Sequence, residues 1–256
     1  MPANDPYCGP APVPSELWTS WNLDPWLIGG FLLAAVLYAF AAWRSPDVHR
    51  RETACFASGW IILAILFNSP FCALTSALFS ARVAHHVIMI AVAAPLIVLG
   101  CPFLARSQVK ANGLGVLFMI QMITIWFWHA PAPYAAALNS HGIFWLMQVT
   151  LLGTALLFWG TLALRPPSLS ALLPLLGNVV QMGLLGALIT FAPSALYEPH
   201  FGTTAPWGIT PLEDQQIAGL IMWIPAAIPY VVAALLVVGA GIGRASSLTR
   251  GSESRA

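Results

Sequence analysis

The chain has 256 residues, of which 59% are hydrophobic and only 7% charged, and its mean hydropathy is +0.79. Soluble domains carry roughly a quarter charged residues, so this composition excludes a soluble protein and indicates an integral membrane protein. A net charge of +1, with ten Lys and Arg in all, argues against a nucleic-acid partner, because phosphate binding needs a basic face.

A membrane-spanning helix needs about 20 mostly apolar residues. Seven stretches fit or nearly fit: 26–43, 53–69, 83–101, 114–129, 143–163, 172–192 and 216–240. None shows the period-two alternation of a membrane barrel. We therefore predict an all-α fold, a polytopic bundle of seven transmembrane helices that lies in the lipid bilayer.

The domain organisation follows from these stretches. Residues 1–25 are Pro-rich and polar, with no basic start and no apolar core, so we expect an N-terminal arm without a cleavable signal peptide. The first span then acts as its own insertion signal. The transmembrane domain covers 26–243, and the small, polar segment 244–256 is predicted to be a disordered tail.

The basic residues predict the orientation. Nine of the ten fall on one set of alternating loops, which the positive-inside rule makes cytoplasmic. The N-terminus is then outside and the C-terminus cytoplasmic, and the one exception is Arg82, near the outer face. The nine are Arg44, Arg50, Arg51, Arg106, Lys110, Arg165, Arg244, Arg250 and Arg255.

The four cysteines match neither a CxxC motif nor zinc-site spacing. The predicted orientation places each of them near one side of the membrane. Cys8 and Cys72 fall outside, whereas Cys55 and Cys101 lie near the cytoplasmic ends of spans. In an oxidising space, Cys8 and Cys72 either form a disulfide that attaches the arm to the helices or remain free thiols. A direct role in binding copper is a third interpretation.

A candidate metal site begins at the outer end of the third span. Ionisable groups within a span are uncommon and usually functional, and here Arg82, His85, His86 and Met89 follow one another at helical spacing. Imidazole and thioether on one helical face favour copper, particularly Cu(I). The alternative is that the histidines only hydrogen-bond to neighbouring helices while Met89 packs.

Other spans carry similar side chains at the same predicted depth. Met122 and His129 lie on one stripe of the fourth span, His141 precedes the fifth, and Met222 lies about two turns into the seventh. We predict that these spans converge, with the histidines as ligands and the methionines as a relay beneath. Arg82 would pair with an acidic residue or hold a partner protein. The predicted metal ligands are His85, His86, Met89, Met122, His129, His141 and Met222.

Several function classes are excluded or left as alternatives. The seventh span has no lysine for a retinal Schiff base, and no hydrolase, metalloprotease, P-loop or dinucleotide motif is present, so we expect no enzyme. A membrane cytochrome remains open, because His85 or His86 with His129 would supply two axial imidazoles to haem. A copper permease and a metal-free scaffold remain open too.

Short motifs spread from the second to the seventh span resemble one family. They are Asn68-Ser69-Pro70, Leu78-Phe79-Ser80-Ala81 with His86, Ala94-Pro95-Leu96, Leu99-Gly100-Cys101-Pro102, Trp128-His129-Ala130-Pro131 with Tyr134, Leu157-Phe158-Trp159, and Gly219-Leu220-Ile221-Met222-Trp223-Ile224-Pro225. In this order they resemble the CtaG family of cytochrome c oxidase assembly factors.

That resemblance implies a seven-span protein of the bacterial plasma (inner) membrane, associated with copper delivery to haem-copper oxidases during biogenesis of the respiratory chain. It implies oxidase subunits as partners and a periplasmic copper donor, so that the protein acts as a metallochaperone. The family commonly has a His-Met-x-x-His pattern where this chain reads Arg82-Val83-Ala84-His85-His86, so that only His86 matches it.

Overall fold

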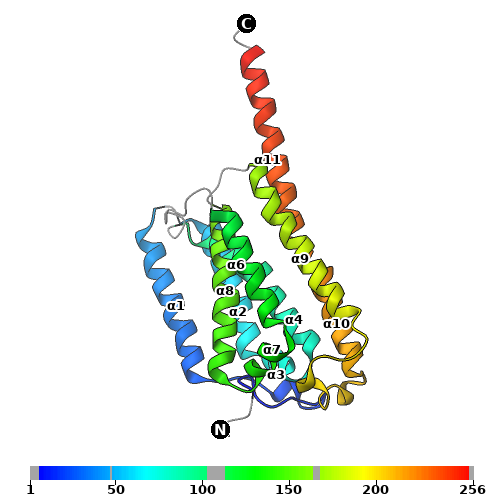
Figure 1. Cartoon of the computed structure of the whole chain (residues 1–256). Coiled ribbons are helices and arrows are strands. Elements are labelled where there is room, and N and C mark those ends of the chain that lie inside the picture. The colour runs from blue at the N-terminus through cyan, green and yellow to red at the C-terminus, as the bar shows by residue number, and fades with distance from the viewer. Residues whose placement is uncertain (1–5, 47, 103–112, 164–167, 254–256) are drawn as a thin grey trace.

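The computed structural model describes residues 6–46, 48–102, 113–163 and 168–253, and within these ranges the protein is helical, with no strand. Five helices are long and apolar enough to cross a membrane, and the number rises to as many as seven if each of two bent helix pairs counts as one span. The helices pack side by side into an elongated bundle (Figure 1). The protein is therefore a helical membrane protein with five to seven candidate spans.

The helices are α1 (Pro25–Arg44), α2 (Arg50–Asn68), α3 (Pro70–Ala77), α4 (Phe79–Ile88), α5 (Ala94–Gly100), α6 (Gly113–Trp128), α7 (Pro131–Leu138), α8 (His141–Ala163), α9 (Leu172–Thr190), α10 (Pro211–Trp223) and α11 (Ala227–Glu253). A π-helical turn, η2 (Met89–Ala93), joins α4 to α5. Short 3₁₀ turns occur at Leu17–Thr19, Leu169–Ala171, Glu198–His200 and Ala205–Trp207.

Proline sets the two bends. Pro70 and Pro131 each occupy the first position of a short helix, where the missing N–H removes no helical hydrogen bond. The chain bends by 53° between α2 and α3 and by 71° between α6 and α7. The second and fourth predicted spans are therefore continued by short, sharply turned helices.

The C-terminal segment differs from its prediction. Helix α11 continues to Glu253, through most of the segment that was expected to be a disordered tail. Among the predicted cytoplasmic cations, Arg106, Lys110, Arg165 and Arg255 lie outside the described residues.

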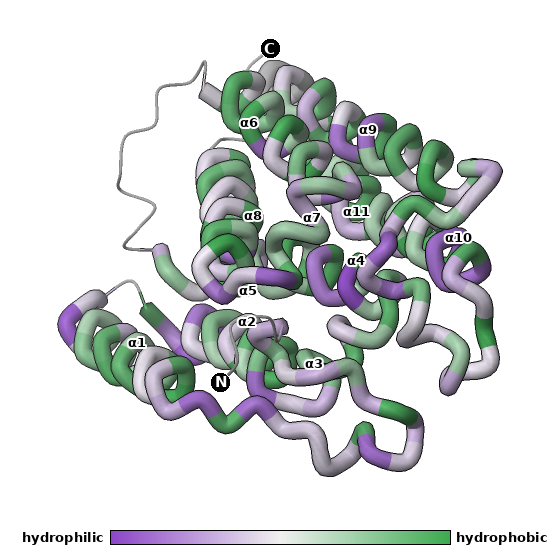
Figure 2. The backbone as a smooth tube through the Cα atoms, turned by 60° about the horizontal axis from the view of Figure 1, so that its bottom comes forward, coloured by the Kyte–Doolittle hydropathy of each residue, from purple (hydrophilic) through white to green (hydrophobic). Residues whose placement is uncertain are grey.

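Helices α4, η2 and α5 lie at the centre of the bundle, and α1 lies at its edge beside α2 (Figures 1 and 2). In the segment Phe79–Gly100, 61% of the most apolar window is buried within the protein, whereas for α1 the buried share is 0%. The apolar side chains that α1 exposes suit contact with lipid. The helix backbone also tolerates lipid, because a helix satisfies its own backbone hydrogen bonds.

Two glycines let α9 and α10 pack backbone to backbone. A Cβ atom added at Gly219 would lie 2.5 Å from the carbonyl oxygen of Gly186, and one added at Gly186 would lie 2.6 Å from the carbonyl oxygen of Gly219. Small residues at such crossings let membrane helices approach closely. This contact positions α10 against the centre of the bundle.

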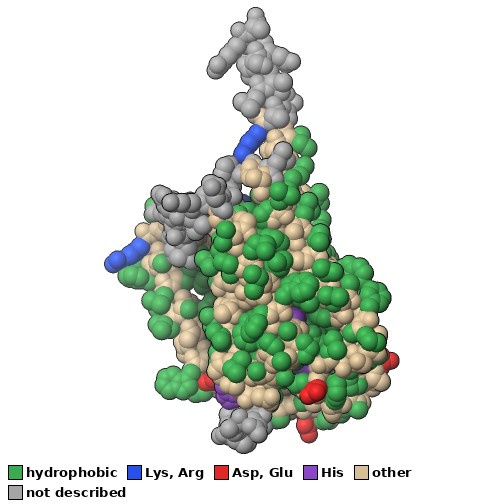
Figure 3. Space-filling view, viewed as in Figure 1, with side chains coloured by type: hydrophobic (Ala, Val, Ile, Leu, Met, Phe, Trp, Pro, Cys, Tyr) green, Lys and Arg blue, Asp and Glu red, His purple; other side chains and the backbone are tan. Residues whose placement is uncertain are grey.

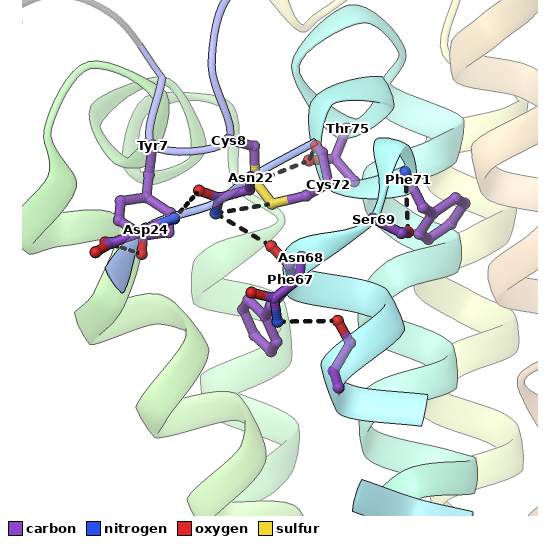
Figure 4. The surroundings of a disulfide bond; sticks show 11 residues. Tyr7, Cys8, Asn22, Asp24, Phe67, Asn68, Ser69, Phe71, Cys72 and Thr75 are labelled. Atoms are coloured by element: carbon purple, nitrogen blue, oxygen red, sulfur yellow. Dashed lines mark hydrogen bonds between the residues drawn. A yellow bond between two sulfur atoms is a disulfide. The ribbon is translucent and has the colours of Figure 1, made fainter. Parts of the chain in front are cut away.

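A disulfide between Cys8 and Cys72 attaches the N-terminal arm to α3 (Figure 4). Close by, the Tyr7 hydroxyl donates a 2.6 Å hydrogen bond to Asp24, and the Asn22 amide donates to the Phe67 carbonyl oxygen. The bond from Tyr7 holds the pKa of Asp24 below its ordinary value. We call the end of the bundle that carries this arm, α3 and α7 the arm end.

On the face shown in Figure 3, the exposed charged side chains separate along the long axis. The Lys and Arg visible in Figure 3 lie toward the end opposite the arm end, while the visible Asp and Glu lie near the arm end. This asymmetry is what the positive-inside rule uses, but which end faces the cytoplasm stays a prediction.

Candidate functional site

His86 and His129 form a pair of facing imidazoles near the arm end. His86 lies on α4, and His129 lies in the bend between α6 and α7; their ring centroids are 5.5 Å apart with the planes at 84°. Both side chains are buried, at 1% and 4% exposed. Residues 43 positions apart in sequence therefore meet in the interior of the bundle.

Hydrogen bonding orients His129 and leaves its other nitrogen free. Nδ1 lies 2.7 Å from the carbonyl oxygen of Ile125, so Nδ1 carries the hydrogen and donates it. The lone pair then sits on Nε2, which has no hydrogen-bond partner in the protein, and neither ring nitrogen of His86 has one. Buried polar atoms are nearly always hydrogen-bonded, so this group of unpartnered nitrogens is typical of a ligand site.

His85 faces a different side of α4 from its neighbour. Its ring meets the edge of Phe67, with centroids 4.9 Å apart, and lies 6.3 Å from the ring of Phe71. The centroid of the His86 ring is 5.7 Å away. Adjacent residues of a helix point about 100° apart, as its 3.6-residue turn requires, so His85 packs among aromatic rings of α2 and α3 while His86 faces His129.

The three predicted thioethers have different surroundings. Met89 begins the π-helical turn, three residues beyond His86, and is fully buried. Met222, on α10, is also buried in the core, whereas Met122, on α6, is only half-buried. Single π-helical turns occur often at functional sites, and Met89 is the thioether that the chain holds nearest in sequence to the histidine pair.

His141 lies with the N-terminal arm. It is exposed at the start of α8, and its ring meets that of Tyr7 at a centroid distance of 5.4 Å. Among residues 6–46, 48–102, 113–163 and 168–253, no three His, Cys, Asp or Glu side chains gather closely enough to hold a metal ion. The predicted set of four histidine ligands is therefore not assembled, and the facing pair is His86 with His129.

Arg82 is fully buried on α4, at 1% exposed. Its guanidinium carbon lies 5.2 Å from the centroid of the Phe144 ring, and it interacts electrostatically with Tyr134. None of its three nitrogens completes a hydrogen bond of good geometry. The expected pairing with an acidic residue is not found, because no ion pair in the described part of the chain includes Arg82.

Asp214 is the buried carboxylate of this region, and it binds the start of α4. The backbone N–H of Phe79 donates to it at 2.7 Å, the N–H of Ser80 donates at 3.2 Å, and the Ser80 hydroxyl donates as well. A helix N-terminus has unpaired N–H groups and a partial positive charge. The carboxylate from α10 supplies the cap that Leu78, the N-cap residue, does not.

A hydrogen-bonded chain connects Tyr134, which interacts electrostatically with Arg82, to the loop before α10. Tyr134 donates to His200 Nε2 at 2.6 Å, because Nδ1 of His200 faces the carbonyl oxygen of Ala77 at 3.2 Å and donates there. Burial lowers the pKa of His200 to about 4. Sequence reasoning gave His200 no role, and the signal available was its position in the long loop after α9.

Tyr197 joins this chain to the histidine pair. Its hydroxyl donates a 2.7 Å hydrogen bond to the backbone carbonyl oxygen of His129, and its ring stacks on Phe79 at 3.6 Å between centroids. Burial raises the pKa of Tyr197 above its ordinary value. The loop between α9 and α10 therefore holds the bend in which His129 sits.

Comparison with known families identifies the protein class. The sequence model described as cytochrome c oxidase caa3 assembly factor (Caa3_CtaG) matches residues 34–241. The chain belongs to this family. No curated protein and no solved structure matched the chain. As a Caa3_CtaG protein it is an assembly factor for cytochrome c oxidase, and the matched range contains Arg82, His86 and His129 but neither the arm nor Cys8.

Proposed function

We propose that this assembly factor binds Cu(I) between His86 and His129 and delivers it to the oxidase. The copper is cargo, and no catalytic step is involved. In this proposal the protein lies in the bacterial plasma membrane with its arm end outside, where the copper is taken up and released. The observation that carries the proposal is the pair of buried, facing imidazoles whose ring nitrogens lack partners.

The distances suit a shared metal ion. Two imidazole nitrogens bound about 2 Å from one metal place their ring centroids roughly 6 Å apart, and less when the nitrogen–metal–nitrogen angle is bent. The centroid separation here is 5.5 Å. The bond from His129 Nδ1 to Ile125 is the kind of supporting contact that fixes the tautomer of a metal-binding histidine.

The nearby side chains favour Cu(I) and weak retention. Imidazole combined with thioether selects this soft ion, and Met89, buried one turn from His86, is our candidate for a third ligand. Arg82 is close enough to act electrostatically on His86. Its positive charge opposes a bound cation, so the site holds copper less tightly, as a protein that passes its cargo on requires.

In this proposal, copper from a soluble donor enters at the arm end. His141 lies on an open cavity of about 520 Å³ that Tyr7 and Asp24 also line. An exposed imidazole beside a carboxylate suits a first, transient contact with a metal ion. In this proposal His141 receives copper, and His86 with His129 holds it.

The test is Cu(I) titration of the purified protein in detergent against a chromophoric chelator. We expect about one ion per chain, and a loss of affinity of at least about tenfold, or 1.4 kcal/mol, in His86→Ala and in His129→Ala. The matched control is His49→Gln. His49 is exposed and precedes α2, at the end of that helix away from the arm end. Equal affinity in all four proteins would refute the site, and a Soret band in the purified protein would indicate haem.

A further inference from the structure

Arg82 carries a buried positive charge, which needs a counter-ion. It is 1% exposed and lies within the central segment Phe79–Gly100. A charge removed from water in this way is strongly unfavourable unless an opposite charge and hydrogen-bond acceptors accompany it. The Phe144 ring, at 5.2 Å, offers only the weak attraction of a cation–π contact.

Asp214 and Asp24, two carboxylates of the arm end, bind other groups. Asp214 accepts its hydrogen bonds from Phe79 and Ser80 at the start of α4. Asp24 accepts from Tyr7 and from the backbone N–H of Trp26. Neither carboxylate forms an ion pair with Arg82.

The nearest neutral groups do not satisfy Arg82 either. Tyr134 directs its hydroxyl hydrogen to His200 and offers the guanidinium only the remaining lone pairs of its oxygen. A hydroxyl oxygen carries no net charge, and all three guanidinium nitrogens remain without a completed hydrogen bond. Arg82 therefore keeps most of its capacity to donate.

Gln148 adds unpartnered donors on α8, the helix that carries Phe144. It is 2% exposed, and neither its amide nitrogen nor its amide oxygen has a hydrogen-bond partner. Gln148 follows Phe144 by four residues, so the two share a face of α8. The ring of Phe144 contacts Arg82, so Gln148 lies one turn beyond that contact along α8.

We propose that Arg82 binds a small free carboxylate inside the bundle. The planar guanidinium presents paired N–H donors that match the two oxygens of a carboxylate, and the Gln148 amide supplies a further N–H. The ion is small because Arg82 is enclosed: a side chain of another protein reaches it only if the helices separate. This inference does not rest on copper binding.

The bound anion has a consequence for the neighbouring pair. The positive charge of Arg82 acts on both His85 and His86. A carboxylate on Arg82 offsets that charge, so anion binding and cation binding at His86 favour each other by the same factor. Uptake of a cation is then favoured when the anion is present and release when it leaves.

Equilibrium dialysis with radiolabelled formate tests the proposal on the full-length protein in detergent, without copper. Saturable binding of about one formate per chain is expected, with at least about a tenfold loss of affinity in Arg82→Gln. Arg44→Gln removes the same charge from an exposed position and should bind as the wild type does. Absence of saturable binding to the wild type, or unchanged binding in Arg82→Gln, overturns the proposal.

Two further measurements keep the result interpretable. Chloride is added as a competitor: displacement of formate only at a large excess supports a carboxylate site, whereas chloride that binds more tightly than formate overturns that assignment. Thermal unfolding is compared as well. Formate should raise the unfolding temperature of the wild type but not of Arg82→Gln, and without formate the variant should be at least as stable, because it lacks an uncompensated buried charge.

Discussion

Replacing Asp214 by Ala should destabilise the bundle at the start of α4. The change removes the acceptor of two backbone N–H groups, at 2.7 and 3.2 Å, and of the Ser80 hydroxyl. Each buried donor left unpaired costs about 1–3 kcal/mol, so the two backbone groups alone predict a loss of about 2–6 kcal/mol in the free energy of unfolding. For a chain of this size that corresponds to a fall of roughly 5–20 °C in unfolding temperature.

The assay is thermal unfolding in detergent, followed by circular dichroism. Glu213→Gln is the matched control, because Glu213 is the neighbouring residue, is exposed, and caps α10 through Thr210 in a way that Gln also allows. Its effect should stay within about 0.5 kcal/mol. If Asp214→Ala and Glu213→Gln lowered the unfolding temperature equally, the argument that Asp214 caps α4 would be refuted.

Three other changes should have measurable effects. The pKa of His200 is lowered to about 4, so between about pH 6.5 and 4 the unfolded chain binds a proton that the native protein does not. His200 should therefore lower the free energy of unfolding by about 1.4 kcal/mol for each unit by which the pH is lowered in this range. Thermal scans of His200→Gln at several pH values should show a smaller dependence on pH. Replacing both Cys8 and Cys72 by Ser opens a loop of 64 residues. By the chain-entropy relation, this should lower the free energy of unfolding by about 4 kcal/mol. Unchanged thermal unfolding of the wild type in reductant would contradict this expectation. Gly219→Ala should cost about 1–3 kcal/mol through overpacking, whereas Gly115→Ala, where an added Cβ meets nothing within 4 Å, should be neutral or stabilising in the same scan.

Much of the fold follows from local sequence. Apolar runs long enough to span a bilayer predicted the membrane class and located the helices, because the period and length of a helix are local properties. The spans predicted to end at 69 and 129 end at Asn68 and Trp128, but the short helices α3 and α7 that follow at an angle were not predicted. The predicted end of the last helix also differs, since α11 continues to Glu253.

For the candidate site too, the sequence predicted what is local to one helix but not the contacts between helices. Sequence spacing correctly placed His85 and His86 on one helix, but it assigned them to one ligand set, whereas the structure turns them to different neighbours. His141 was grouped with them because it precedes a span, and the fold places it beside Tyr7. The roles of Asp214 and His200 depend on contacts with residues more than 60 positions away, which spacing does not encode.

The sequence by itself determined that this chain is a membrane protein, where its helices run, and which family it resembles, because hydropathy and short motifs are read along the chain. Only the tertiary structure decided which polar groups meet. Buried side chains are satisfied or left unpartnered according to what other helices bring to them. For that reason Arg82, predicted to pair with an acidic residue or to hold a partner protein, is enclosed beside Phe144 and Tyr134, while His86 faces His129.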